Sequence, residues 1–173
     1  IAPDQLIASA KQVYGKEVYS ALYGEIRPVP ESRVETPRDG ATIRVGSRSL
    51  RIAYTRGHAE HHFCIFDEQT RGWFSGDMFG VSYPKLRFPQ GSFVMPATTP
   101  TQFDPELYQQ SVRNLAAFDP NRFYLTHFGP LTFHPDQVES LCRQLRAYDE
   151  LVEDGPREAA SLESKILEIA LAE

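Results

Sequence analysis

The sequence has very little cysteine and no long apolar segment. Its 173 residues include only two cysteines, Cys64 in an apolar run and Cys142 in a helical pattern. This scarcity excludes a disulfide framework and a cysteine-rich zinc cluster, so we expect two reduced, buried thiols. No apolar run approaches the roughly 18 residues that a transmembrane helix needs, and the first residues given show no basic segment followed by an apolar stretch. These absences predict a cytoplasmic protein that does not associate with membranes.

Positive charge is also scarce. The chain has 18 Lys and Arg residues against 23 Asp and Glu residues, a formal net charge of -5. The scattered basic residues form no stripe that could follow a phosphate backbone, so nucleic acid is not an expected partner. A chain of this length can bury one sizeable core, and we expect a single domain over residues 1–173. Because a helical pattern already runs at Ile1, we also expect a fragment of a longer protein.

The spacing of apolar residues predicts an α+β protein. Two short helical patterns end at Gly15 and Gly24, and residues 80–101 show no clear period, which indicates a long structured loop. Asp104 and Pro105 indicate the start of a helix that runs to about residue 118. The other expected elements are a hairpin over 42–54, strands at 63–66, 73–75 and 122–126, and two helices after residue 134 separated at residues 155–156.

Three potential metal ligands follow the ends of expected strands. His58 comes after Gly57, Asp77 comes after Gly76, and His127 comes directly after the strand at 122–126. Neutral imidazoles and carboxylates on rigid strand ends hold catalytic metals in hydrolases, because fixed geometry keeps one coordination position open for water. The alternative is that the Gly-His and Gly-Asp pairs only form turns. We expect His58, Asp77 and His127 to be metal ligands.

The same residues carry a family resemblance. Thr-x-Gly-His at His58, with His62 four places on, then Ser-Gly-Asp at Asp77 and Thr-His at His127, resembles the second half of the metallo-β-lactamase fold. By this resemblance His58 ligates the first metal, Asp77 is the catalytic residue that bridges both metals, and His127 ligates the second. His62 supports the site without binding metal. The resemblance implies the C-terminal half of an αββα sandwich, with a mixed β-sheet covered by helices.

The family's main ligand string, His-x-His-x-Asp-His, does not occur in these 173 residues. Besides the histidines already named, the chain has only His61 and His134. We expect His61 to face solvent and His134 to begin a helix. The resemblance implies two divalent metal ions in the full-length protein, with zinc as the default and iron as the alternative. We expect this chain alone to hold them partly or not at all.

The resemblance implies a metal-dependent hydrolase that acts on a small molecule with a metal-bound hydroxide as nucleophile, here incomplete and inactive in isolation. Two alternatives remain open: a di-iron oxygen-binding or redox protein on the same fold, and a non-catalytic interaction or structural module. The substrate-binding residues are unknown, because the aromatic residues of the segment 80–101 either contact substrate or pack on the sheet. A half-sandwich exposes an apolar sheet face, so we expect a homodimer through that face or the C-terminal helices.

Overall fold

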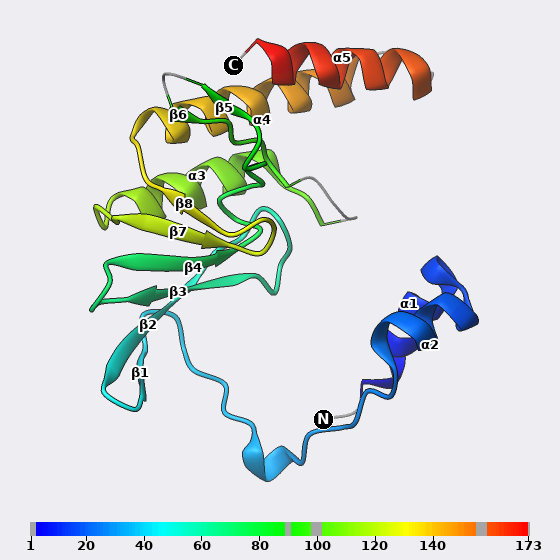
Figure 1. Cartoon of the computed structure of the whole chain (residues 1–173), viewed down its shortest axis with the longest axis vertical. Coiled ribbons are helices and arrows are strands. Elements are labelled where there is room, and N and C mark those ends of the chain that lie inside the picture. Colours follow the sequence, from blue (N-terminus) through cyan, green and yellow to red (C-terminus); the bar gives the residue numbers. More distant parts are fainter. Residues whose placement is uncertain (1–2, 89–90, 98–101, 155–158, 173) are drawn as a thin grey trace. The chain divides into compact units, whose positions relative to one another are not determined.

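The structure is a computed structural model that describes residues 3–88, 91–97, 102–154 and 159–172 (Figure 1). Its internal contacts divide the chain into two compact units, Ile1–Pro37 and Arg38–Glu173. No helix of the described residues combines the length and the apolar character needed to cross a membrane.

The first unit is a helical hairpin. Helices α1 (Asp4–Tyr14) and α2 (Lys16–Tyr23) meet at Gly15 and pack against each other, and a short 3-10 turn, η1 (Glu31–Arg33), follows. Gly15 and Gly24 both have positive φ angles, which glycine adopts without strain, so each ends a helix where the sequence predicts an end.

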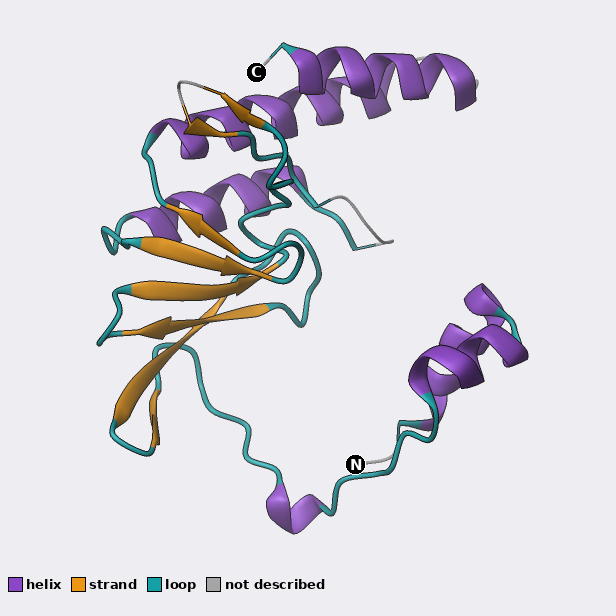
Figure 2. Cartoon of the chain, viewed as in Figure 1, coloured by secondary structure: helices purple, strands orange, loops and turns teal. Residues whose placement is uncertain are grey.

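The second unit contains a six-stranded mixed sheet in the order β1-β2-β3-β4-β7-β8 (Figure 2). β4 and β7 run parallel, and all other neighbouring strands run antiparallel. Together with the helices, this sheet confirms the α+β class that the sequence predicts. The strands are β1 (Thr42–Val45), β2 (Arg48–Tyr54), β3 (Phe63–Asp67), β4 (Gly72–Gly76), β7 (Arg122–Leu125) and β8 (Pro130–Thr132).

Three helices belong to this unit: α3 (Pro105–Ala116), α4 (Asp136–Asp154) and α5 (Ala159–Leu171). The side chain of Asp104 caps α3 by accepting a hydrogen bond from the Leu107 N–H at 2.9 Å, and Pro105 occupies the first turn. α4 packs on α3, and α5 packs on α4. The capping residue and the proline account for the helix start that the sequence predicts.

The hydrophobic core lies between one face of the sheet and helices α3 and α4. Strand residues alternate between the two faces, so every second side chain of the central strands enters this core. The buried cluster contains Cys64, Phe66, Trp73, Phe123, Leu125 and Leu131 from the sheet, Tyr108, Val112 and Leu115 from α3, and Val138, Leu141, Cys142 and Leu145 from α4. Both cysteines are free and buried, as expected.

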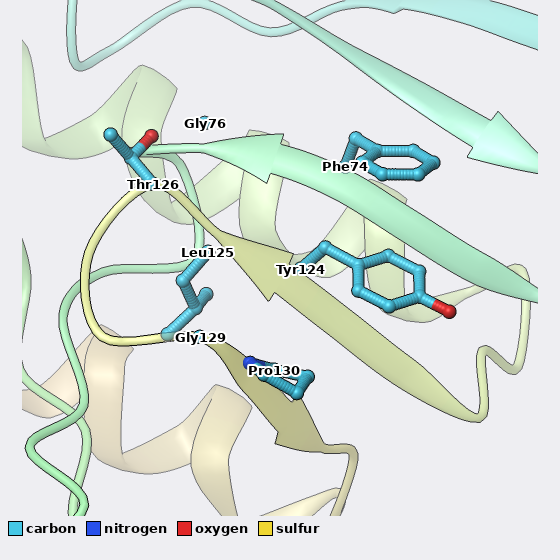
Figure 3. A pocket seen from close by; sticks show the side chains of 7 residues that line it. All are labelled: Phe74, Gly76, Tyr124, Leu125, Thr126, Gly129 and Pro130. Atoms are coloured by element: carbon cyan, nitrogen blue, oxygen red, sulfur yellow. The ribbon is translucent and has the colours of Figure 1, made fainter.

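The other face of the sheet carries exposed aromatic residues. Tyr54, Phe63 and Phe74 are 52%, 50% and 46% exposed, and the ring of Phe74 stacks on that of Tyr124 with 4.7 Å between centroids. A depression of about 460 Å³ is lined by Phe74, Gly76, Tyr124, Leu125, Thr126, Gly129 and Pro130. Figure 3 shows the side chains of Phe74 and Tyr124, whose rings stack. Exposure of apolar ring surface to water is unfavourable, which makes this face a candidate for coverage by another polypeptide layer.

The segment after β4, expected to be a long structured loop, also contains two short strands and contributes to the core. β5 (Arg87–Phe88) and β6 (Gly91–Ser92) form a two-stranded sheet, and Val81 bridges Met95. Val94 is 2% exposed and belongs to the core. The sequence did not predict the two strands, because strands of two residues are too short to show a period. The strand β8 was not predicted either, because its three residues are also too few to show a period. Residues 89–90 and 98–101 lie outside the described residues.

Neighbouring residues of β4 provide a test of which sheet face is the core. Trp73 is fully buried and donates a hydrogen bond from its indole nitrogen to the Leu115 carbonyl at 3.0 Å, whereas Phe74 is 46% exposed. We expect Trp73→Ala to lower the free energy of unfolding by about 3–5 kcal/mol. Phe74→Ala, as the matched control, should lower it by less than about 1 kcal/mol. Urea unfolding measures both, and a loss for Phe74→Ala as large as that for Trp73→Ala contradicts an open outer face.

Candidate metal centre

The sheet topology gathers the predicted ligands at one edge. β3 runs antiparallel to both β2 and β4, and β7 runs parallel to β4, so the ends of β2, β4 and β7 meet the start of β3. His58 and His62 lie in the loop between β2 and β3, Asp77 follows β4, and His127 lies two residues beyond β7. The pairing of these strands therefore brings residues that are far apart in the sequence to one edge of the sheet.

The carboxylate of Asp77 lies between His58 and His127. Its Oδ2 is 3.6 Å from Nε2 of His58, and its Oδ1 is 3.4 Å from Nε2 of His127. Two ligands at about 2.0–2.2 Å from one tetrahedral zinc are themselves about 3.3–3.6 Å apart. Each carboxylate oxygen thus stands at the separation from one imidazole that a shared metal ion requires.

The tautomer of His58 determines whether Nε2 can donate a hydrogen bond to Asp77. Nδ1 of His58 lies 3.0 Å from the carbonyl oxygen of Ala97, and because a carbonyl only accepts hydrogen bonds, Nδ1 carries the proton. In the neutral ring, Nε2 then points a lone pair at the negatively charged Asp77 oxygen. Two acceptors face each other, and a proton or a cation between them is needed to make this contact favourable. A carbonyl that fixes the ring of a histidine in this way is typical of metal ligands.

Asp77 also differs from Asp67, the buried carboxylate at the end of β3. Burial alone would raise the pKa of Asp67, but hydrogen bonds from Thr70 and Gln69 and the charge of Arg48 lower it below its ordinary range. By contrast, Oδ1 of Asp77 is shielded from solvent and has no hydrogen-bond partner among the described residues. A buried acceptor without a partner costs free energy, so it is expected where a ligand completes the site.

The three side chains form two pairs, His58 with Asp77 and His127 with Asp77. They do not surround one common point as three ligands of a single ion would. Within the described residues, no group of three or more His, Cys, Asp and Glu side chains is arranged so that it could hold a metal ion by itself. His58 is nearly buried, and the side chain of His127 is 52% exposed. The residues present therefore fit part of a two-metal site, with two donors for each ion.

His62 makes hydrogen bonds with both ring nitrogens and is not free to bind a metal. The Asp77 N–H donates to Nε2 at 3.3 Å, so Nδ1 carries the proton and donates to Oγ1 of Thr55 at 2.7 Å. The Thr55 hydroxyl lies 3.3 Å from Sγ of Cys64, which donates to the Ser75 carbonyl at 3.3 Å. This chain of hydrogen bonds connects the Asp77 main chain to the core.

Burial keeps the members of this chain neutral. It lowers the pKa of His62 to about 4, with a smaller contribution in the same direction from repulsion by a protonated His58 nearby. It also raises the pKa of the Cys64 thiol to about 12, against a smaller opposite effect of the Thr55 hydrogen bond. A thiol with so high a pKa is a weak nucleophile, in agreement with a structural role for Cys64.

Gly76 makes the contact between His62 and Asp77 possible. Its φ angle is +54°, and a Cβ atom at this position would lie 2.6 Å from Nε2 of His62. Any other residue would push the imidazole away from the Asp77 N–H. The glycine in the Ser-Gly-Asp motif is therefore required by both conformation and space.

Three contributors to the site were not assigned a role from the sequence. Thr55 belongs to the Thr-x-Gly-His motif, but nothing in the motif reveals its bond to His62. Ala97 acts only through its main chain, which leaves no sequence signal. Tyr108 donates a hydrogen bond to the Asp77 carbonyl, yet its apolar spacing on α3 indicates only a core residue. His61 and His134 are both exposed and outside the site.

The space at Gly76 can be tested against a glycine that has the same conformation and free surroundings. Gly46 has a φ angle of +61°, and a Cβ atom added there would meet nothing within 4 Å, so Gly46→Ala measures backbone strain alone, about 1–2 kcal/mol. We expect Gly76→Ala to lower the free energy of unfolding by about 1–3 kcal/mol more, because the methyl group displaces His62. Chemical denaturation measures both, and equal losses would show that the His62 contact is unimportant.

The pKa of His62 predicts a dependence of stability on pH in the metal-free chain. The ordinary value of 6.5 applies to the unfolded state, and the folded value is about 4. Between these values the unfolded state binds a proton that the folded state does not, so stability falls as the pH decreases from about 6.5 to 4. His62→Gln lacks this contribution while keeping the same carboxylates. We expect a larger loss of unfolding free energy from pH 7 to 4.5 in the wild type than in the variant; equal losses contradict the assignment.

Comparison with known proteins agrees with this geometry. Residues 4–127 match the family described as the metallo-beta-lactamase superfamily. The chain is 24% identical over 147 residues to a metallo-beta-lactamase fold-containing protein of Sulfurisphaera tokodaii, a match that covers 85% of this chain and 51% of that protein. A stretch of 40 residues is 45% identical to a hydroxyacylglutathione hydrolase of Francisella tularensis subsp. novicida and covers 23% of this chain and 16% of that protein.

A solved structure supports the same fold. The archaeal metallo-beta-lactamase superfamily protein from Sulfolobus tokodaii superimposes with a TM-score of 0.60 and 22% identity, over 98% of this chain and 62% of that one. This chain therefore spans about half to three-fifths of the length of these relatives. The family match extends over more than half of the sequence, and the chain belongs to the metallo-beta-lactamase superfamily.

Proposed function

We propose that this chain is the C-terminal part of a metal-dependent hydrolase that acts on a small molecule. The observation that carries the proposal is the Asp77 carboxylate, whose two oxygens face two different histidines at 3.6 and 3.4 Å. An aspartate with one oxygen toward each imidazole is suited to bridge two metal ions. The membership of the superfamily and the hydrolase among the relatives support this interpretation.

Each residue has a role that follows from its surroundings. The Ala97 carbonyl keeps the proton of His58 on Nδ1, so Nε2 offers its lone pair to the first ion. Asp77 would hold both ions, and His127, which lies in an exposed loop, would offer Nε2 to the second. A bound divalent cation would supply the hydroxide nucleophile, because it lowers the pKa of a coordinated water to about 7 in favourable sites. Zinc is the default ion, and the mixed imidazole and carboxylate set also accommodates iron.

The site needs further ligands that the described part of this chain does not provide. Catalytic zinc takes about three protein ligands, and each pair here supplies two. The chain covers 51% and 62% of two relatives, which leaves room in them for a further part of the fold. We propose that the remaining part of a longer protein supplies these ligands and covers the exposed face around Phe74 and Tyr124. On this proposal residues 1–173 are one part of a single catalytic domain, and the isolated chain is a poor catalyst.

The proposed ligands can be tested by zinc titration of the full-length protein. We expect His58→Gln, Asp77→Asn and His127→Gln each to weaken zinc binding by at least roughly ten-fold and to lower hydrolysis in parallel. The control is His61→Gln, because His61 is exposed and adjoins the same loop without entering the site. Unchanged affinity in the three variants, or an equal loss in the control, contradicts the assignment.

Two further measurements separate the alternatives. Elemental analysis that finds stoichiometric iron with a visible chromophore favours a di-iron oxygen-binding or redox protein, and full-length protein without bound metal favours an interaction module.

Light scattering of the 173-residue chain tests what covers the outer face. We expect a homodimer or self-association when the other part is absent, and a strictly monomeric chain contradicts a face that needs cover.

A further inference from the structure

The first turns of α3 lie against both loops that carry the candidate ligands His58 and Asp77. Tyr108, in the second turn, is fully buried. Its hydroxyl donates a hydrogen bond of 2.6 Å to the main-chain carbonyl of Asp77. The acceptor is the residue that bridges the proposed site, yet the contact uses the main chain and leaves the carboxylate untouched.

The same residue also limits the position of the His58 loop. A Cβ atom at Gly57 would lie 2.1 Å from the Tyr108 nitrogen and 2.3 Å from its Cα, so the Gly57 main chain touches the Tyr108 main chain directly. The Asp104 N–H, at the cap of α3, donates to the Gly57 carbonyl at 2.8 Å. The rings of His58 and Tyr108 meet edge to face with centroids 6.5 Å apart. His58 is therefore placed by the helix turn that contains Tyr108.

We infer that Tyr108 is a positioning residue that fixes the separation between His58 and Asp77. The main chain of Tyr108 limits how closely the His58 loop can approach α3. Its hydroxyl holds the main chain of Asp77 through a hydrogen bond. Nε2 of His62 accepts a hydrogen bond from the Asp77 N–H, so the Asp77 main chain is fixed at both its donor and its acceptor. The value of this fixation for metal binding rests on the proposed function, but the fixation itself does not.

The surroundings of the Tyr108 hydroxyl make it a dependable donor. Burial raises the pKa of Tyr108 far above its ordinary value, so the group stays neutral and keeps its proton. A hydrogen bond in such a dry environment is stronger than in water, and an unpaired carbonyl there is costly. Removal of the hydroxyl should therefore let the Asp77 loop move to find another partner.

The test compares Tyr108→Phe with Ser111→Ala in the full-length protein and in this chain. Tyr108→Phe keeps the ring and removes the hydroxyl that donates to the Asp77 carbonyl. Ser111 lies one turn further along α3 and donates to the Arg56 carbonyl at 2.8 Å, so Ser111→Ala removes one bond from the same helix to the His58 loop and leaves Asp77 alone. The two readouts are the backbone amide signals of metal-free protein by NMR and the affinity for zinc in competition with a chelator.

We expect Tyr108→Phe to shift the amide signals of Asp77 and its neighbours and to weaken zinc binding by about ten-fold or more, the effect of losing a group that orients a ligand. Ser111→Ala should shift only signals near Arg56 and change zinc affinity by less than about two-fold. Unchanged Asp77 signals, or equal losses of zinc affinity in both variants, overturn the inference. If wild-type protein binds no zinc, the proposed function fails, and the amide signals alone decide whether Tyr108 positions Asp77.

Discussion

The site depends on how Asp77 is held. His62 accepts from its N–H and Tyr108 donates to its carbonyl, so the main chain of this one residue is fixed from two different elements. No described residue forms a hydrogen bond with Oδ1 of the carboxylate, which directs one oxygen toward each of two histidines. A residue that used its carboxylate for structural hydrogen bonds, as Asp67 does, would have no oxygen left for a ligand role. Fixing the main chain is what leaves the side chain available.

The sheet makes this arrangement possible and also leaves it incomplete. Parallel pairing of β4 and β7, beside antiparallel β3, gathers the ligand-bearing loops at one edge, and α3 supports that edge from the core side. The opposite face, around Phe74 and Tyr124, is open and aromatic right up to the same edge. On the proposed function, a layer that covered this face would also be in the right place to bring further ligands to the site.

Most helices and long strands could be predicted from the sequence because their signals are local. Asp104 and Pro105 indicate a cap and a first turn, and alternating apolar residues indicate the hairpin over 42–54. The candidate ligands can be recognised because each lies in a short motif, two of them directly after a glycine. The short strands of the segment after β4 were missed, since two residues show no period. The role of Tyr108 was missed because the sequence pattern of a buried tyrosine is the same whether or not its hydroxyl reaches a ligand loop.

The central claim is that the two oxygens of Asp77 serve two different metal ions. Anomalous diffraction at the zinc edge from crystals of the zinc-loaded full-length protein tests it most directly. We expect two peaks, one within about 2.2 Å of Nε2 of His58 and Oδ2 of Asp77, the other within about 2.2 Å of Nε2 of His127 and Oδ1 of Asp77. Peaks that bind neither histidine, or zinc sites that leave the Asp77 carboxylate uncoordinated, would contradict it.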